Sequence, residues 1–311
     1  MSEATVLAAG ITGVLNNLDP TLPQNDGAFS RIRFVTRENC VVGPVQHPAC
    51  ASMATTTVAD RVINVVQSCF AKLGGETGMA EGALGMPASC SVISGVDPRR
   101  GGAPYINQLT VGGLGGPGVH GHDGWMTYGI PVTGGVLHGD SLEVDEQNFP
   151  ILYECHELIP DSGGAGKWRG APGVECRIRQ RLAPGTWIYP SDGHHNPAKG
   201  VAGGLPGRRS DVWKYGPDDP ARQDLPKVSQ ELLHPGEILV SESCGGGGYG
   251  DPLERDPEKV SWDVREGFVS LESARDVYGV VIDTGSELYA VDHEATARLR
   301  ASLKRKHGEA R

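Results

Sequence analysis

The sequence predicts an α/β protein of the α+β type, in which β-rich mixed sheets are flanked by a few helices and joined by many glycine and proline turns. Three observations predict this fold. Forty-five glycines and 22 prolines make up about a fifth of the 311 residues, well above the usual ~12%. Short runs of β-branched and aromatic residues recur between residues 89 and 240, as expected for many short strands. Helical spacing of apolar residues is confined to the segments on either side of that region.

Residues 1–88 are predicted to hold a loop, one strand and one amphipathic helix. The segment "LDPTLPQNDGAFSRIRFVT" is punctuated by Pro, Asn, Asp and Gly and is expected to enter a strand at Ile32–Thr36. A helix should follow, because seven apolar residues fall at helical spacing on one stripe: Val58, Val62, Val65, Val66, Cys69, Phe70 and Leu73. Gly74 and Gly75 are expected to end this helix.

Residues 89–252 are predicted to form the β-rich region. Each strand candidate is bounded by Gly, Pro or Asp: "SCSVISGV", "YINQLTV", "ECRIRQRL", "TWIYPSD" and "EILVSES". The segment "RRSDVWKYGPDDPARQDLPKVSQELLHPGE" is predicted to be a surface excursion between strands.

Residues 253–311 are predicted to be a helical region. Asp256 can cap a helix that begins at Pro257, and three apolar residues share one stripe of that helix: Val260, Val264 and Phe268. Ser270 should cap a second helix, which Gly279 ends before a strand "VVID". The tail "HEATARLRASLKRKHGEAR" is expected to be a basic helix. We expect all three regions to form one continuous structural unit.

Composition and charge disfavour several classes of function. A net charge of −10 and a pI near 5.5 argue against a nucleic-acid partner, which needs a basic face. No stretch approaches the roughly 20 apolar residues that span a bilayer, and the N-terminus lacks the pattern of a secretory signal. The seven cysteines include no C-x-x-C pair, so neither a disulfide framework nor a zinc ribbon is indicated. We therefore predict a cytoplasmic protein without a membrane partner.

The stretch "SESCGGGGYGDP" at residues 241–252 raises the question of nucleotide binding. A phosphate loop needs lysine and then serine or threonine after its last glycine, to reach the phosphates and magnesium. Here Asp251 and Pro252 follow Gly250, and a carboxylate would repel phosphate. We predict a structural turn instead, where the backbone passes too closely for side chains, at a domain or subunit junction. Its residues are Gly245, Gly246, Gly247, Gly248 and Asp251.

Two clusters of polar residues are candidates for chemistry. The cluster in "HGHDGW" is predicted to supply catalytic groups: His120, His122 and Asp123. Imidazole and carboxylate are metal-ligand types, but the final histidine of the H-x-H-x-D-H pattern of binuclear metallohydrolases is missing, so we predict polar pocket groups and no metal site. The cluster in "SDGHHNP" is predicted to bind substrate or line a pocket: Asp192, His194 and His195. Members of either cluster could also be turn residues that bond to loop backbone.

Several motifs occur here in the order seen in one known family. They are "DSGGAGKWRGAPGV", "SDGHHNPAKGVAGGLPG", "HPGE" and "GGGGYGDPLERDPEKVSWDVREGFVSLESARDVYGVVID". The early "LDPTLPQNDGAFSRIRFVT" is similar to that family's P-x-N-x-G segment. Over residues 19–283 the chain thus resembles the hydantoinase B/oxoprolinase family, specifically the C-terminal half of a B-type subunit.

The resemblance implies both partners and cofactors. Family members are B-type subunits of ATP-dependent N-methylhydantoinases, caprolactamases and oxoprolinases, and of acetone and acetophenone carboxylases. They work beside a hydantoinase A-type subunit, which binds ATP with magnesium and phosphorylates an enol or amide oxygen, so no cofactor is expected on this chain alone. No "HxxD…HH" element precedes Asp19. The resemblance therefore implies a separate chain that carries the N-terminal half of the B-type subunit and its divalent metal, zinc or manganese.

The function implied by this resemblance is that of one subunit in a larger enzyme, inactive alone. We expect a cytoplasmic, ATP-dependent, multi-subunit carboxylase of ketones, of the acetophenone or acetone type. One alternative is a subunit of an ATP-dependent hydantoinase, oxoprolinase or lactamase, which hydrolyses a cyclic amide. Another is a non-catalytic assembly subunit.

Overall fold

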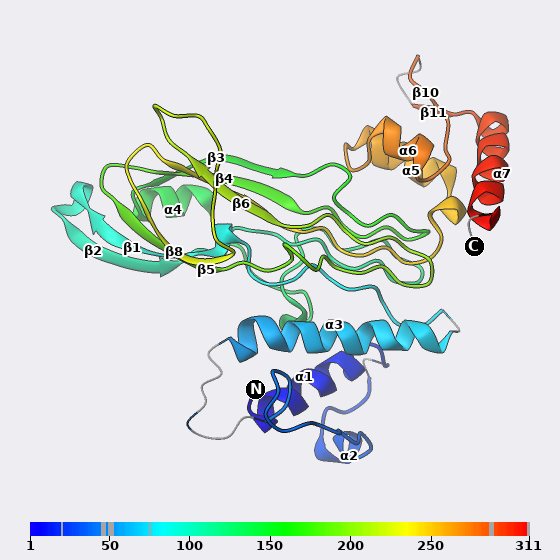
Figure 1. The fold of residues 1–311 in the computed structure, drawn as a ribbon, viewed down its shortest axis with the longest axis horizontal. Coiled ribbons are helices and arrows are strands. Elements are labelled where there is room, and N and C mark those ends of the chain that lie inside the picture. Colours follow the sequence, from blue (N-terminus) through cyan, green and yellow to red (C-terminus); the bar gives the residue numbers. More distant parts are fainter. Residues whose placement is uncertain (20, 45–47, 49–52, 75, 286–288, 310–311) are drawn as a thin grey trace.

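Two antiparallel sheets form the centre of the fold (Figure 1). The computed structural model describes all residues except 20, 45–47, 49–52, 75, 286–288 and 310–311. One sheet has the order β2-β1-β5-β8, with bounds Ala103–Gln108, Val92–Asp97, Gly185–Pro190 and Val228–Leu233. The other has the order β3-β4-β9-β6-β7, with bounds Ile151–Leu158, Val174–Gln180, Ile238–Glu242, Asp211–Tyr215 and Gln223–Asp224.

The two sheets pack face to face around one hydrophobic core. Buried residues alternate along the strands, most clearly in β4 and β5, which is the period of a sheet with one face inward. The inward side chains of both sheets belong to a single cluster that includes Ile93, Trp187, Leu233, Ile178, Val212 and Leu239. Trp187 of β5 donates a hydrogen bond of 3.0 Å to the buried Gln180 of β4, so a polar contact also joins the two sheets within the core. The predicted α/β class with β-rich sheets is confirmed.

The strand predictions are confirmed for β1, β2, β4, β5, β9 and the short β10, and two other predictions are wrong. Ile32–Thr36 is not a strand, because no neighbouring strand pairs with it in the described part of the chain and Val35 is 84% exposed. The supposed surface excursion contains β6, β7 and β8. Its many charged residues obscure the fully buried Val212 and Leu233. Strand β3 was not predicted at all.

An N-terminal layer of helices lies along one side of this body (Figure 1). It comprises α1 (Glu3–Leu15), α2 (Asp26–Phe29), a π-helical turn (Ala54–Val58), α3 (Ala59–Phe70) and a 3-10 turn (Ala71–Leu73). Helix α3 lies between α1 and the body. Short helical turns elsewhere are Ala88–Cys90, Pro98–Arg100, Pro131–Thr133 and Pro252–Glu254, and α4 spans Leu142–Asn148.

The helix predicted from the apolar stripe is confirmed, but the stripe is not its buried face. The buried residues of α3 are Ala59, Asp60, Ile63, Asn64 and Gln67. Asn64 exchanges two hydrogen bonds with the backbone of Gly82, at 3.0 and 3.1 Å. By contrast, Val65 is 53% and Leu73 is 77% exposed. Asn64 can face the body because the backbone of an adjoining loop satisfies both its donor and its acceptor.

The C-terminal region packs around its own small core at the far end of the body (Figure 1). It contains α5 (Pro257–Arg265), α6 (Leu271–Asp276), the pair β10 (Ile282–Asp283) and β11 (Ala290–Val291), and α7 (His293–Glu309). The predicted caps are confirmed, since Asp256 accepts from the Glu258 amide and Ser270 accepts from the Ser273 amide. The N-cap residues thus predicted the starts of these C-terminal helices correctly.

Extended glycine-rich segments lie side by side between the sandwich and the C-terminal helices (Figure 1). We call them the glycine bundle, residues 112–118, 162–171, 199–207 and 244–250. They exchange backbone hydrogen bonds across segments, for example Gly164 to Gly246, Gly118 to Gly247 and Gly248 to Leu205, at 2.8–2.9 Å. A Cβ added at any of Gly245–Gly248 would lie 1.9–2.2 Å from a carbonyl oxygen of another segment. As at the axis of collagen, only glycine fits this spacing.

Two further findings concern cysteines and helix length in the described residues. The six described cysteines are free thiols: Cys40, Cys69, Cys90, Cys155, Cys176 and Cys244. No helix in the described ranges is both long and apolar enough to cross a bilayer.

Candidate functional site

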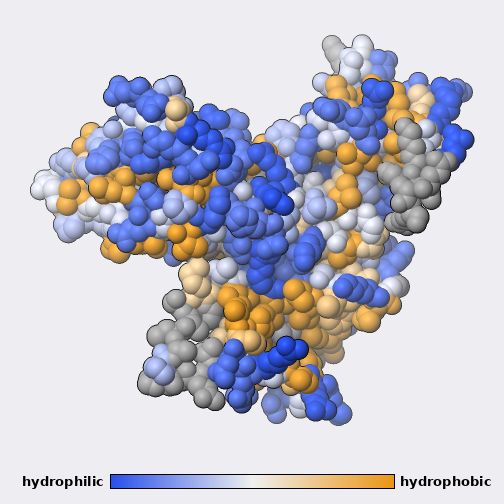
Figure 2. Space-filling model, viewed as in Figure 1, coloured by the Kyte–Doolittle hydropathy of each residue, from blue (hydrophilic) through white to orange (hydrophobic). Residues whose placement is uncertain are grey.

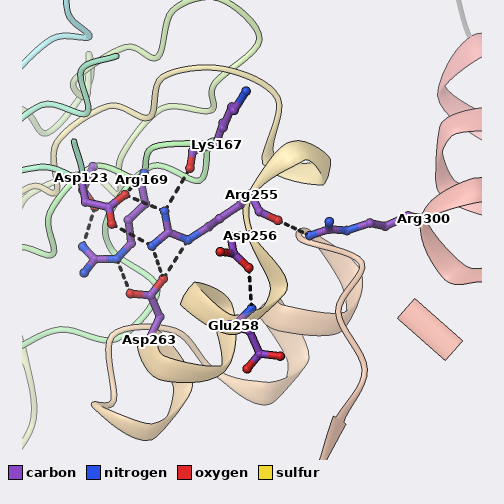
Figure 3. Close-up of polar contacts among 9 residues, drawn as sticks. Asp123, Lys167, Arg169, Arg255, Asp256, Glu258, Asp263 and Arg300 are labelled. Carbon is purple, nitrogen blue, oxygen red and sulfur yellow. Dashed lines mark hydrogen bonds and ion pairs between the residues drawn. The ribbon is translucent and has the colours of Figure 1, made fainter. Parts of the chain in front are cut away.

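The three residues predicted to be catalytic have different surroundings. His120 places Nε2 at 3.1 Å from a carboxylate oxygen of Glu76, and its ring packs edge-on against Trp168 and Tyr249, with centroids 6.0 and 6.2 Å apart. His122 is exposed. Asp123 accepts hydrogen bonds from arginine and backbone (Figure 3). The structure therefore joins His120 to an aromatic cluster and Asp123 to an ionic one.

Asp123 belongs to a buried ionic cluster of two aspartates and two arginines (Figure 3). Arg255, 1% exposed, donates to both oxygens of Asp123 at 2.6 and 2.9 Å and twice to one oxygen of Asp263 at 2.7 and 3.0 Å. Arg169 donates to the other oxygen of Asp263 at 2.9 Å. Burial acts to raise the pKa of Asp123, but hydrogen bonding and charge from Arg255 outweigh it and hold that pKa below its ordinary value. Charges are balanced, as buried ions require.

The ionic cluster fastens the C-terminal helices to the glycine bundle. Asp263 comes from α5, and Arg169 from the bundle itself. Arg300 of α7 donates to the carbonyl oxygen of Arg255 at 2.6 Å and to that of Tyr278 at 3.0 Å (Figure 3). Segments that are far apart in sequence are therefore joined through these arginine side chains, which have a positioning role.

The second predicted cluster is tied to the N-terminal layer. Arg61 of α3 donates to both oxygens of Asp192 at 2.9 and 3.0 Å. Burial acts to raise the pKa of Asp192, whereas Arg61 and the Gly193 amide lower it, and the result is a lowered pKa. His194 is buried with Nε2 at 2.8 Å from the Ser191 hydroxyl, and burial lowers its pKa. His195 is exposed. The Asp192 carboxylate thus helps to dock α3.

One buried atom in this second cluster lacks a hydrogen-bond partner in the described part of the structure, Nδ1 of His194. Nearby, Cys244 is fully buried, and its sulfur accepts a hydrogen bond from the Leu84 amide at 3.3 Å. Burial raises the pKa of the Cys244 thiol, which opposes formation of the nucleophilic thiolate.

A cavity of about 450 Å³ lies beside the sandwich and was missed by sequence reasoning. Its polar lining includes Thr110, Thr127, Tyr128, Asp140, Glu143 and His156. Asp140 accepts from the Thr110 amide at 2.7 Å, and His156 places Nε2 at 2.6 Å from the Val111 carbonyl oxygen. Because a carbonyl only accepts, Nε2 of His156 is the donor in this hydrogen bond.

The size of this cavity suits a small molecule, and its carboxylates and imidazole could bind a ligand that donates N–H groups. The lining residues come from separate segments without a shared motif, so no sequence signal marked them. Among the residues that the structure describes, no group of three His, Cys, Asp or Glu side chains is arranged to hold a metal ion. The described residues therefore do not fit a resident divalent metal.

Sequence comparisons match this fold to known proteins. The profile of the hydantoinase B/oxoprolinase family matches residues 1–252. The beta subunit of caprolactamase from Pseudomonas jessenii is 32% identical over 288 residues, which cover 90% of this chain and 48% of that protein. The acetophenone carboxylase delta subunit of Aromatoleum aromaticum is 25% identical over 328 residues, covering 93% and 47% respectively.

Solved structures show the same relationship. The crystal structure of ATP-dependent caprolactamase from Pseudomonas jessenii has a TM-score of 0.80 at 26% identity and covers 94% of this chain and 50% of that chain. The nucleotide-free structure of acetone carboxylase has a TM-score of 0.79 at 20% identity and shares the fold. The chain spans about half the length of these relatives. Its family profile match covers well over half of its residues, and the chain belongs to the hydantoinase B/oxoprolinase family.

Proposed function

We propose that this chain supplies half of the B-type body of an ATP-dependent enzyme that opens cyclic amides. The observation that carries the proposal is the 32% identity to the caprolactamase beta chain across 90% of this chain. The caprolactamase structure adds support, because its TM-score of 0.80 extends over 94% of this chain. ATP-driven carboxylation of a ketone, the function expected from the sequence, is the second candidate. It is favoured by the acetophenone carboxylase delta subunit, which aligns with 93% of the chain.

The proposed enzyme needs other chains. A hydantoinase A-type subunit would bind ATP and magnesium, and a separate chain would supply the N-terminal half of the B-type body together with a zinc or manganese ion. Relatives are themselves named as subunits, among them the alpha subunit of acetone carboxylase from Xanthobacter autotrophicus. We place the assembled enzyme in the cytoplasm, in keeping with the free thiols of the described cysteines.

The predicted site residues divide into two proposed roles. Asp123 and Asp192 are positioning residues, since their carboxylates are held by Arg255 and Arg61. His120 and His122, whose side chains are half-buried and exposed, remain the groups of that cluster proposed to face the reaction space of the assembled enzyme. His194 and His195 would lie at its edge.

Product identity in the assembled complex tests the proposal. The complex is purified through a tag on this chain and supplied with ATP and either caprolactam, 5-oxoproline or a hydantoin, or acetophenone with labelled bicarbonate. Ring-opened amino acid is the expected product. Label fixed into a keto acid, without ring opening, would replace this proposal with the carboxylase. Turnover of neither class, with an intact complex, would contradict both.

One substitution tests the pocket role of the exposed histidine. We expect His122→Ala to lower turnover of the complex at least tenfold without dissociating it. His234→Ala, at another exposed histidine, is the matched control and should leave turnover unchanged. Equal turnover in both variants would remove His122 from the site.

A further inference from the structure

The N-terminal layer carries an apolar surface that the chain does not bury. A groove of about 280 Å³ lies between α1, the segment 34–43 and α3, and its lining includes Val6, Phe34, Val35, Val42, Val62 and Val66. Around it, Val35 is 84%, Val41 is 72% and Val65 is 53% exposed. Figure 2 shows hydrophobic residues gathered over α3 and its surroundings. Contiguous apolar patches of this kind mark interaction sites more often than isolated exposed residues do.

This surface is exposed because α3 uses its other face to dock on the body. The docking contacts are polar: Asn64 bonds to the Gly82 backbone, Arg61 to Asp192, and Asp60 to the Val132 amide. The apolar stripe of α3 therefore points away from those contacts, and α1 covers only part of it, where Val58 and Val62 pack against the cluster that includes Val6. A helix that docks on its own body with one face and carries apolar residues on another is expected to contact a second body through that other face.

The chain segment that leads into this surface carries three arginines. Arg31, Arg33 and Arg37 are exposed within seven residues of one another, and Arg37 also lines the groove. Within the described ranges none of the three forms an ion pair. The chain as a whole has a net charge of −10, so this strip stands out from its acidic background. It would complement a partner whose apolar ridge is bordered by carboxylates.

We propose that this surface, formed by α1, residues 31–43 and α3, binds the chain that supplies the other half of the B-type body, through an apolar segment edged with Asp or Glu. The inference rests on the proposed function. The relatives continue for about as many residues again as this chain covers, and under the proposed function the companion chain supplies those residues. An apolar core with a charged edge is the usual composition of such an interface.

Substitutions at two exposed valines test the surface. Val35→Asp and Val65→Asp, singly and together, are made in the full chain and co-expressed with the companion chain that matches the first half of the B-type relatives. Because both side chains are largely exposed, the variants should fold as the wild type does. We expect the double variant to bind the companion at least 100-fold more weakly. The matched controls Val136→Asp and Val144→Asp, at residues 71% and 51% exposed elsewhere, should bind normally.

Thiol labelling provides a second readout that does not depend on mutation. Cys40 is exposed and lines the groove, so its alkylation should slow at least tenfold when the companion binds. Cys155 of β3, half-buried outside this surface, should react at an unchanged rate.

The outcomes separate this inference from the proposed function. Normal binding by the double variant, in a complex that still opens cyclic amides, overturns the surface assignment and leaves the function standing. Self-association of the wild type that Val35→Asp abolishes would assign the surface to a second copy of this chain and overturn the proposal. A wild-type chain that neither binds the companion nor self-associates overturns both.

Discussion

At the residue scale, the docking of α3 buries the carboxyl group of Asp60 and raises its pKa. It is fully buried, with one oxygen at 2.8 Å from the Val132 amide and the other without a partner in the described part of the chain. Burial raises its pKa from an ordinary value of 3.8 to about 7, although the Val132 amide acts to lower it. Tyr128 is the titratable neighbour, and its own pKa is raised by burial and then by the charge of Asp60.

This titration predicts a pH dependence of stability. Between about pH 4 and 7 the folded state holds a proton that the unfolded state has lost, so the contribution of Asp60 to the free energy of unfolding falls as pH rises and levels off above the folded pKa of about 7. Asp60→Asn cannot ionise. From pH 5 to 7 we expect the variant to gain about 2 kcal/mol relative to the wild type. Urea unfolding at both pH values measures this, and a difference that is the same at both would contradict it.

Substitution of Arg255 should change the free energy of unfolding by more than substitution of Asp60 does. Arg255→Met would leave Asp123 and Asp263 with one arginine between them, and an unpaired buried carboxylate costs about 3–5 kcal/mol. Arg265→Ala is the control, because its contact with Glu266 is exposed on both sides and such pairs contribute about 0–1 kcal/mol. Urea unfolding of the two variants should differ accordingly. Similar small losses in both would show that the ionic cluster does not hold the C-terminal helices.

The candidate site shows why residues adjacent in sequence were an incomplete guide to chemistry. His120, His122 and Asp123 lie within four positions, yet Asp123 is bound by Arg255, 132 residues away. Nothing in "HGHDGW" indicates that partner. The cavity beside His156 could not be predicted for the same reason, since its lining is assembled from separate segments.

At the scale of elements, prediction succeeded where the signal is local. Asp256 and Ser270 cap α5 and α6 because an N-cap needs only its own first turn. Strands β6 and β8 were missed because their exposed positions are charged, and only tertiary pairing shows that Val212 and Leu233 are core. The glycine excess predicts turns. Its packing into the glycine bundle depends on backbone contacts between segments up to about 130 residues apart, such as those of Gly118 with Gly247.

The close backbone contacts of the glycine bundle predict that an added Cβ there prevents folding. A Cβ at Gly246 would lie 1.9 Å from the Gly116 carbonyl oxygen, which no side-chain rotation can relieve, so Gly246→Ala should abolish the soluble folded protein. Gly216→Ala is the matched control, because its Cβ would be 3.9 Å from the Asp219 carbonyl oxygen, its nearest neighbour beyond the adjoining residues. Soluble yield and circular dichroism of both variants decide the matter. A folded Gly246→Ala protein would contradict the packing described.

At the scale of the whole molecule, a sandwich, a glycine bundle and two helical layers make a body that corresponds to about half of each relative in length. The ionic cluster holds one helical layer and the polar face of α3 holds the other. The apolar surface of that second layer is the one that we propose for the companion chain. This arrangement accounts for a chain that carries the family fold while its chemistry, as proposed, is completed elsewhere.

The most direct test of this account compares ATP-dependent ring opening by the purified chain alone with that of the complex reconstituted from this chain, its companion and the A-type subunit. The account predicts no turnover by the isolated chain and ring-opened product, with ATP consumed, by the complex. Turnover by the isolated chain, with its own stoichiometric divalent ion, would contradict it.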